Sequence, residues 1–127
     1  MNLFLLDIIE DTVVDGPGFR TSLYAAGCRH HCPGCHNPQS WEREHGHAVG
    51  VEEVAERLLT DPFSNITFSG GDPLEQVEAF TELVIRLKRC RMMNKTKRIF
   101  GVIPVIATKR CAGLPSWHKS CLISMFW

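Results

Sequence analysis

Three cysteines stand close together in the segment Cys28-Arg29-His30-His31-Cys32-Pro33-Gly34-Cys35. Their C-x3-C-x2-C spacing supplies three thiolates, whereas a [4Fe-4S] cluster needs four ligands, so one iron is left open to bind and activate a small molecule. A structural zinc site is an equally good interpretation, because a nearby histidine can serve as the fourth ligand: His30, His31 or His36. The spacing alone predicts a metal centre and leaves both metals open.

Three further motifs surround this loop. Before it stands Val14-Asp15-Gly16-Pro17-Gly18-Phe19-Arg20, directly after it His36-Asn37-Pro38-Gln39-Ser40-Trp41, and further along Thr67-Phe68-Ser69-Gly70-Gly71-Asp72-Pro73-Leu74. In this order the motifs resemble the radical S-adenosylmethionine (SAM) activating enzymes, and within them the small subgroup of anaerobic ribonucleoside-triphosphate reductase-activating proteins. Many members of the wider superfamily carry an aromatic residue where this chain has Gly34, and the subgroup accepts glycine there.

The resemblance implies the chemistry of the site. Cys28, Cys32 and Cys35 are expected to ligate three irons of a [4Fe-4S] cluster, with the amino and carboxylate groups of SAM on the fourth. One electron from the reduced cluster then cleaves SAM to a 5′-deoxyadenosyl radical, which abstracts a hydrogen atom; the cofactor carries this chemistry and the protein positions it. No catalytic residue is expected beyond the cluster ligands.

The glycine-rich turn is expected to bind SAM. In relatives this turn contacts the SAM amino group, and the role is carried here onto three residues: Gly70, Gly71 and Asp72. Glycines let a backbone approach a ligand closely. A branched side chain at Gly71 is therefore expected to weaken SAM binding more than cluster loading, on the assumption that the cysteine loop lies elsewhere.

The expected function is that of an oxidoreductase, a radical SAM activase that installs a glycyl radical on an anaerobic ribonucleoside-triphosphate reductase. Its electrons are expected from a donor such as flavodoxin or ferredoxin. One alternative is an activase of another glycyl-radical enzyme such as pyruvate formate-lyase, although those relatives are longer than this chain. The other alternative is a small zinc-binding interaction module with a basic tail. Neither nucleic acid nor a membrane is an expected partner.

Other residues with chemical potential receive lesser roles. Asp15-Gly16-Pro17-Gly18 is a turn by composition, and by resemblance to the family it helps to wall the mouth of the active site. Arg20 either meets a carboxylate or a partner protein, or is solvated. Trp41 is expected to pack against the cysteine loop. Most of the five histidines in this stretch are expected to face solvent: His30, His31, His36, His45 and His47. Three further cysteines receive no role: Cys90, Cys111 and Cys121.

The spacing of apolar residues predicts alternating strands and helices. Strands are expected at residues 3–9, 21–26, 65–68 and 99–107, and a helix at residues 51–59 that ends at Asp61-Pro62. Asp72 is expected to cap a second helix with Pro73 at its first position. Strands that alternate with helices predict an α/β fold with a mostly parallel sheet. The resemblance completes this fold as a partial, incomplete radical SAM-type barrel with the cluster at the C-terminal ends of its strands.

Composition sets the outer bounds. At 127 residues, 44% of them hydrophobic, the chain is expected to form one small domain with a modest core. It has no run of about 18 apolar residues that would span a membrane. Its apolar start is interrupted by Asp7, Glu10 and Asp11 and lacks a basic beginning, unlike a signal peptide. A cytoplasmic location agrees with cysteines that stay reduced.

Charge divides the chain sharply. All fourteen acidic residues lie in residues 1–82 beside only four basic ones, a formal charge of −10, and residues 83–127 carry +10. Such a tail is commonly a nucleic-acid arm. Here the family resemblance is lost at about the same place. We therefore interpret residues 1–90 as the radical SAM core and residues 91–127 as an aberrant basic tail, encoded out of frame.

The genetic code permits a check of this interpretation. Codons for residues 99–110 can be written so that reading from their third nucleotide gives Ile-Trp-Cys-Tyr-Thr-Gly-Tyr-Arg-Tyr-Glu-Glu, which resembles the next strand and helix start of the family. The last five residues give Ile-Asp-Val-Leu in the same shifted frame, and a stop codon directly after Trp127 would add a further Val, so that the whole resembles a later strand of the family. Only the first letter of each shifted codon is free, because the encoded residues determine the other two. The alternatives are coincidence and a divergent basic tail.

Overall fold

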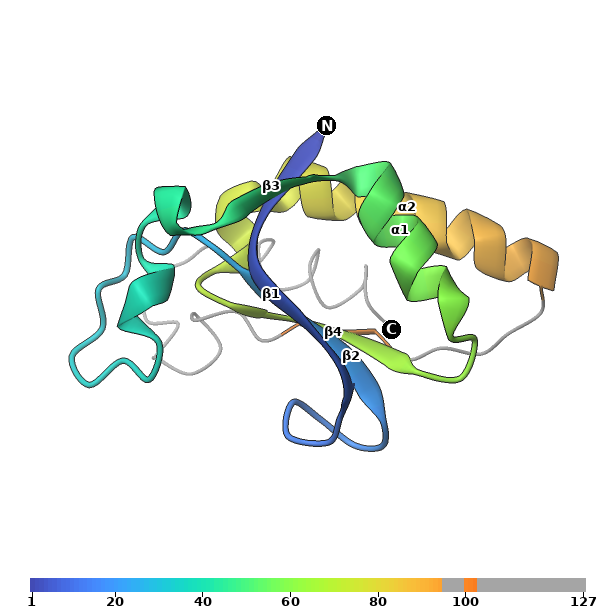
Figure 1. Ribbon diagram of the computed structural model, residues 1–127, viewed down its shortest axis with the longest axis horizontal. Helices are drawn as coiled ribbons and strands as arrows, with labels where there is room; N and C mark the ends of the chain where they lie inside the picture. Colours follow the sequence, from blue (N-terminus) through green and yellow to red (C-terminus); the bar gives the residue numbers. More distant parts are fainter. Residues whose placement is uncertain (95–99, 103–127) are drawn as a thin grey trace, which may run out of the picture.

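Five strands form one open sheet in the order β3-β1-β2-β4-β5 (Figure 1). The computed structural model describes residues 1–94 and 100–102, with side chains up to residue 90, so most of the tail expected at residues 91–127 lies outside the described residues. The strands are β1 (Asn2–Thr12), β2 (Arg20–Ala25), β3 (His47–Gly50), β4 (Asn65–Gly70) and β5 (Phe100–Val102). Three of the strands expected from the sequence are present as β1, β2 and β4; of the fourth, expected at residues 99–107, residues 100–102 form β5, and residues 99 and 103–107 lie outside the described residues.

The sheet is mixed: two of its four strand pairings are parallel and two are antiparallel, so the expectation of a mostly parallel sheet is wrong. Strands β2, β4 and β5 run parallel, whereas β1 runs antiparallel to both of its neighbours, β2 and β3. The short connection through residues 13–19 explains this, because parallel strands need a crossover of a dozen or more residues. Strand β3 is short and lacks an apolar run, so the sequence did not indicate it. Within the described residues the sheet does not close into a barrel.

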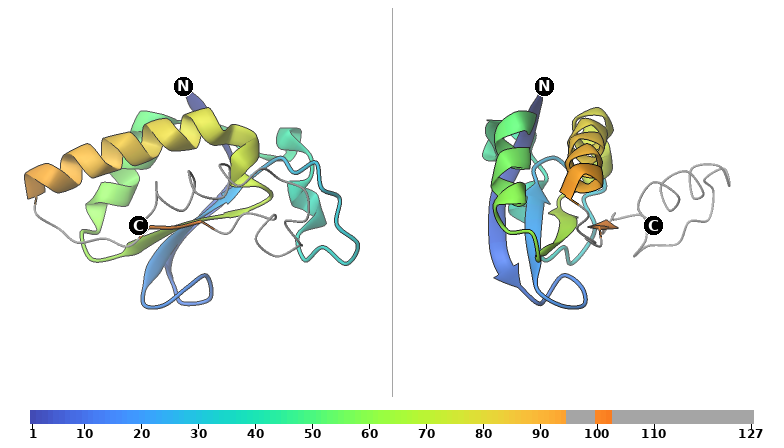
Figure 2. Two further views of the ribbon diagram at one scale, coloured as in Figure 1. Left: turned by 180° about the vertical axis from the view of Figure 1, so that it is seen from behind. Right: turned by 90° about the vertical axis from the view of Figure 1, so that its right-hand side faces the viewer.

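The two helices cover the same face of the sheet and pack against each other (Figure 2). Helix α1 (Val51–Thr60) ends immediately before Asp61, as expected, and buries the predicted apolar stripe. Helix α2 (Val77–Asn94) follows the 3₁₀ helix η3 (Pro73–Gln76). Its first residue, Val77, is exposed. The core between helices and sheet consists of Leu3, Leu5, Leu23, Ala25, Val51, Val54, Ala55, Leu58, Ile66, Phe68, Ala79, Phe80, Leu83, Val84 and Leu87.

Side chains of β2 and β4 alternate between two environments. Leu23 and Phe68 point to the helix side and join the core, whereas Arg20, Ser22 and Thr67 lie on the opposite, polar side because successive strand residues face opposite ways. The Arg20 guanidinium donates through Nε to Thr67 Oγ1 at 2.6 Å, which places both side chains together. In the described residues no helix covers this polar side.

The local signals for helix ends are confirmed. Asp72 caps η3, since its side chain accepts a hydrogen bond from the Leu74 N–H at 3.0 Å, and Pro73 is the first residue of that helix. Two 3₁₀ helices that the sequence did not indicate follow the cysteine loop: η1 (Pro38–Ser40) and η2 (Arg43–His45). Among the described residues, no helix is both long enough and apolar enough to cross a membrane.

Candidate metal centre

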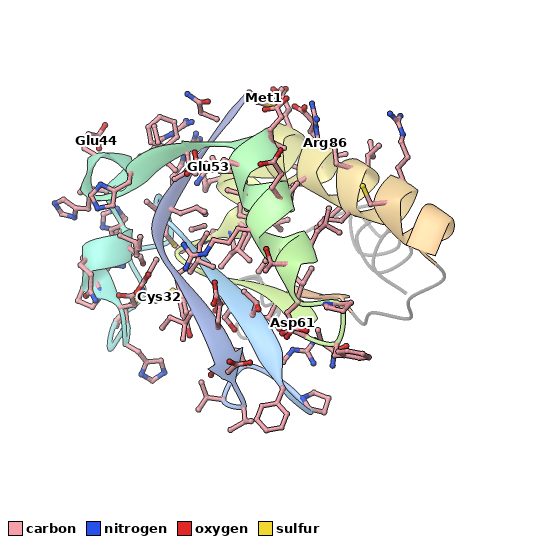
Figure 3. All side chains as sticks on the ribbon, turned by 45° about the vertical axis from the view of Figure 1, so that its right-hand side comes forward. Met1, Cys32, Glu44, Glu53, Asp61 and Arg86 are labelled. Carbon is pink, nitrogen blue, oxygen red and sulfur yellow. The ribbon has the colours of Figure 1, made fainter. Side chains whose placement is uncertain are left out.

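The cysteine loop and the glycine-rich turn leave the sheet at the same edge. Strands β2 and β4 are parallel, and Ala25 at the end of β2 lies opposite Gly70 at the end of β4. The segments that follow both strands must therefore start side by side. In Figure 3, Cys32 lies in this loop, well separated from Asp61 at the end of α1.

Two backbone hydrogen bonds close the base of the cysteine loop. The Gly27 N–H donates to Ser40 O at 2.8 Å, and the Cys28 N–H donates to Trp41 O at 3.0 Å. The Trp41 ring packs against His31, with ring centroids 4.5 Å apart. The prediction that Trp41 packs against the cysteine loop is confirmed.

The three cysteines lie in one tight loop. Cys28 is buried, Cys32 and Cys35 are partly buried, and the Cys35 N–H donates to Cys32 O at 3.1 Å. Two residues with left-handed backbone, His31 (φ 42°) and Gly34 (φ 71°), turn the chain between the thiols. Burial raises the pKa of the Cys28 thiol, and the nearby Asp72 carboxylate, Cys32 and Cys35 raise it further. A hydrogen bond from the backbone of His30 acts in the opposite direction and lowers this pKa.

The donors fit an iron-sulfur cluster in type, because all three are thiols of one loop. A coordinating metal ion would deprotonate a thiol whose pKa is otherwise raised by burial and by negative neighbours. In residues 1–94 and 100–102, no three side chains of Cys, His, Asp or Glu converge closely enough to hold a metal ion. The structure thus collects the three thiols in one loop, and the assignment of Cys28, Cys32 and Cys35 as ligands stays a prediction.

The glycine-rich turn packs directly on the base of this loop. The Gly71 N–H donates to Ala25 O at 2.8 Å, and the Asp72 N–H donates to Gly27 O at 2.9 Å. A Cβ atom on Gly71 would lie 2.6 Å from Gly27 O and 2.9 Å from Ser40 O. The expectation that the cysteine loop lies away from Gly71 is therefore wrong: the absent side chain makes room for the loop itself.

Gly70 has a second reason to be glycine. Its φ is +99°, and a Cβ atom there would lie 2.4 Å from Ala25 N and 2.7 Å from Ala25 O. Both the backbone conformation and the packing against β2 exclude a side chain. The two glycines thus have structural requirements that the sequence motif did not reveal.

Asp72 joins the turn to the cysteine loop. Asp72 is 2% exposed. Its Oδ2 lies 3.1 Å from Nε2 of His30, a residue that stands between Cys28 and Cys32 in the chain. All five histidines of this stretch, His30 included, are exposed, as expected for most of them. The His30–Asp72 contact was missed because the histidine tract gave no sign of which member contacts a buried carboxylate.

Gln76 is a further residue that sequence reasoning missed. It is 6% exposed, its Oε1 accepts from the Phe4 N–H at 2.8 Å, and its Nε2 donates to Phe4 O and Ala26 O, both at 2.9 Å. Gln76 therefore links η3 to the strands that precede the cysteine loop. Its position four residues before Phe80, on the same face as that apolar residue, was the available signal.

The loop of residues 13–19 covers the polar side of the sheet. Arg20 is 2% exposed, so it is not solvated; its guanidinium also donates to Pro17 O at 2.8 Å, and burial lowers its pKa. The Tyr24 hydroxyl donates to Asp15 Oδ2 at 2.5 Å. Burial, followed by this hydrogen bond, raises the pKa of Tyr24 to about 12. The predicted role of the Asp15–Gly18 turn at the active-site mouth stays a prediction.

A family match identifies the class of protein that the three-thiol loop by itself left open, an iron-sulfur protein. Residues 14–105 match the family described as a 4Fe-4S single cluster domain, and the chain belongs to that family. The match spans the loop before β2, the cysteines, the glycine-rich turn and β5. It favours a [4Fe-4S] cluster over zinc, and it extends past residue 90, where the resemblance was expected to end.

Named relatives narrow the comparison. The chain is 34% identical over 84 residues to the anaerobic ribonucleoside-triphosphate reductase-activating protein of Vibrio cholerae, covering 60% of this chain and 54% of that protein. It is 39% identical over 64 residues to the protein of the same name from Enterobacteria phage T4. It is also 38% identical over 85 residues to the pyruvate formate-lyase-activating enzyme of Clostridium pasteurianum, covering 62% of this chain and 34% of that protein. The chain spans about half or less of the length of these relatives.

Proposed function

We propose that the chain is a radical SAM activase of a glycyl-radical enzyme. The observation that carries this proposal is the direct packing of the three-thiol loop on the Gly70-Gly71-Asp72 turn, at the C-terminal edge of parallel strands. Ligands of open α/β sheets bind at this edge. The family match supplies the cluster, and the names of the relatives supply the activating role.

In this proposal the three cysteine thiolates hold three irons, and the fourth iron is left for SAM. When bound, the reduced [4Fe-4S] cluster supplies the electron that cleaves SAM. The N–H groups of Gly71 and Asp72 already donate to Ala25 O and Gly27 O. The SAM amino group, itself a donor, therefore needs acceptors from the turn, and the Asp72 carboxylate is the strongest of these.

We infer that β2, β4 and β5 belong to a partial radical SAM-type barrel, with the helices outside and the polar side chains of β2 and β4 inside. Flavodoxin or ferredoxin is the proposed electron donor. The proposed location is the cytoplasm, where thiolates remain reduced.

The proposed target is an anaerobic ribonucleoside-triphosphate reductase, because relatives from Vibrio cholerae, Escherichia coli and phage T4 carry that name. A pyruvate formate-lyase-type target is the second candidate, favoured by the Clostridium relative. Each purified target is incubated with the reduced, SAM-loaded protein, and the glycyl radical is measured by electron paramagnetic resonance. A signal on the reductase alone supports the first target, and one on the lyase alone supports the second.

Cysteine variants test the cluster assignment. Cys28→Ala, Cys32→Ala and Cys35→Ala are each expected to lose SAM cleavage after anaerobic reconstitution, because a lost thiolate exposes a second iron. Cys90→Ala, in α2, is the matched control and is expected to behave as the unmodified protein. Iron and sulfide analysis with paramagnetic resonance measures the result. Unchanged cluster content in all three variants, or a colourless protein that binds zinc, would contradict the proposal.

A further inference from the structure

We propose that His30 is a positioning residue that joins the cysteine loop to the glycine-rich turn through Asp72, so that loop and turn behave as one body. The inference deepens the proposed function and rests on it, because it concerns how the two halves of that site are held together. His30 lies 42 positions before Asp72 in the chain. The contact therefore exists only when β2 and β4 are correctly paired.

One oxygen of the Asp72 carboxylate contacts the η3 helix, and the other contacts the cysteine loop. Oδ1 accepts from the Leu74 N–H at 3.0 Å and caps η3, while Oδ2 lies 3.1 Å from His30 Nε2. Since an ionised carboxylate only accepts hydrogen bonds, His30 donates through Nε2. A single side chain thus caps a helix and positions the loop that carries the thiols.

Burial makes this contact more than a surface ion pair. The Asp72 side chain is 3% exposed, whereas the His30 side chain is 38% exposed. A buried carboxylate oxygen that loses its donor is left without hydration, which strongly disfavours that arrangement. Asp72 therefore favours the loop conformation that brings His30 inward.

The neighbouring residue provides a contrast within the same loop. Arg29 also reaches the η3 helix, through an ion pair with Glu75 at 2.8 Å, but the Arg29 side chain is 86% exposed. Exposed ion pairs contribute little because water and salt screen them. Of these two contacts from the segment between Cys28 and Cys32, the one made by His30 is expected to determine the loop position.

The base and the segment between Cys28 and Cys32 are held separately. Backbone hydrogen bonds from Gly27 and Cys28 hold the base, and they survive any change at His30. Loss of the His30 side chain is therefore expected to loosen residues 29–35 without unfolding the domain. The thiols then sample more positions, and both cluster assembly and binding at the Asp72 turn become weaker.

Three variants test this role: His30→Ala, His30→Gln and Arg29→Ala. Hydrogen–deuterium exchange of the metal-free protein is the first measurement, with α1 as an internal reference for an intact fold. His30→Ala is expected to speed exchange of residues 29–35 by about tenfold, above all at the Cys35 N–H that bonds to Cys32 O, and Arg29→Ala by less than about twofold. His30→Gln, whose Nε2 can still donate, is expected to recover most of the protection.

Iron and sulfide content after reconstitution is the second measurement, followed by the change that SAM causes in the paramagnetic resonance of the reduced cluster. His30→Ala is expected to lose several-fold in both, and Arg29→Ala in neither. Equal exchange in His30→Ala and the unmodified protein overturns the inference, as does a glutamine variant no better than alanine. If the unmodified protein takes up no iron-sulfur cluster while the exchange difference persists, the proposed function fails and the positioning role stands.

Discussion

Position 71 requires glycine because backbone atoms occupy the space that a side chain would need. A Cβ atom would meet the carbonyl oxygens of Gly27 and Ser40, which belong to backbone at the base of the cysteine loop and cannot rotate away. Gly71→Ala is therefore expected to lower cluster loading and SAM binding together, and to destabilise the fold by about 1–3 kcal/mol. Iron content and chemical denaturation measure the two effects.

Gly50→Ala is the control for this variant, because a Cβ atom at Gly50 would approach only Glu52 Oε2, at 4.0 Å. It is expected to load the cluster normally. Normal loading in Gly71→Ala with loss of SAM binding alone would restore the view that this glycine serves only the ligand.

Tyr24 makes the stability of the fold depend on pH in the alkaline range. Its pKa is raised to about 12 in the folded protein, first by burial and then by the hydrogen bond to Asp15, from an ordinary value of 10.0. The neutral phenol is therefore favoured by folding. Its contribution is fully present below pH 10 and is lost as pH rises from 10 through 12. Because the ring is partly exposed, we expect a loss of about 1–2 kcal/mol.

The measurement is direct, because the chain has one tyrosine. Absorbance at the tyrosinate band is expected to rise with a midpoint near pH 12, and near pH 10 in denaturant. Asp15→Asn lowers the folded midpoint, and Tyr24→Phe removes the pH-dependent difference in the free energy of unfolding. A folded midpoint at the ordinary value would show that the loop of residues 13–19 does not cover Tyr24.

Helix η3 and strands β1 and β2 depend on one side chain for their alignment. Gln76 makes three hydrogen bonds to the backbone of Phe4 and Ala26. Gln76→Leu leaves the buried groups without these partners and is expected to lower the free energy of unfolding by about 2–4 kcal/mol. Gln39→Leu, at an exposed position in η1, is the control and is expected to change it by less than about 0.5 kcal/mol. Equal stability of the two variants in denaturant titrations would contradict this role.

The whole chain carries a charge division that the described fold does not explain. We propose that residues after about 90 are encoded out of frame, with residues 1–90 as the core. The family match reaches residue 105, and β5 pairs with β4 as the next parallel strand; both findings count against a shift that begins as early as residue 90. The nucleotide sequence is expected to show an open alternative frame over residues 99–127. Stop codons in that frame would refute the proposal.

Local chemistry was readable from the chain alone. The spacing of Cys28, Cys32 and Cys35, the apolar stripe of α1 and the cap at Asp72 depend on residues a few positions apart, and the helix and cap predictions are confirmed. The family was likewise contained in the order of the motifs. These features need no knowledge of which strand lies beside which.

Contacts between distant segments required the folded chain. The antiparallel placement of β1, the fit of Gly71 against Gly27 O and the His30–Asp72 hydrogen bond all follow from strand order and register. In the sequence, one histidine of an exposed tract cannot be told from the next, and one glycine of a turn cannot be told from another, whatever atoms each of them contacts. Which of them turns inward is determined by the pairing of β2 with β4, because that pairing brings the cysteine loop and the glycine-rich turn to the same edge.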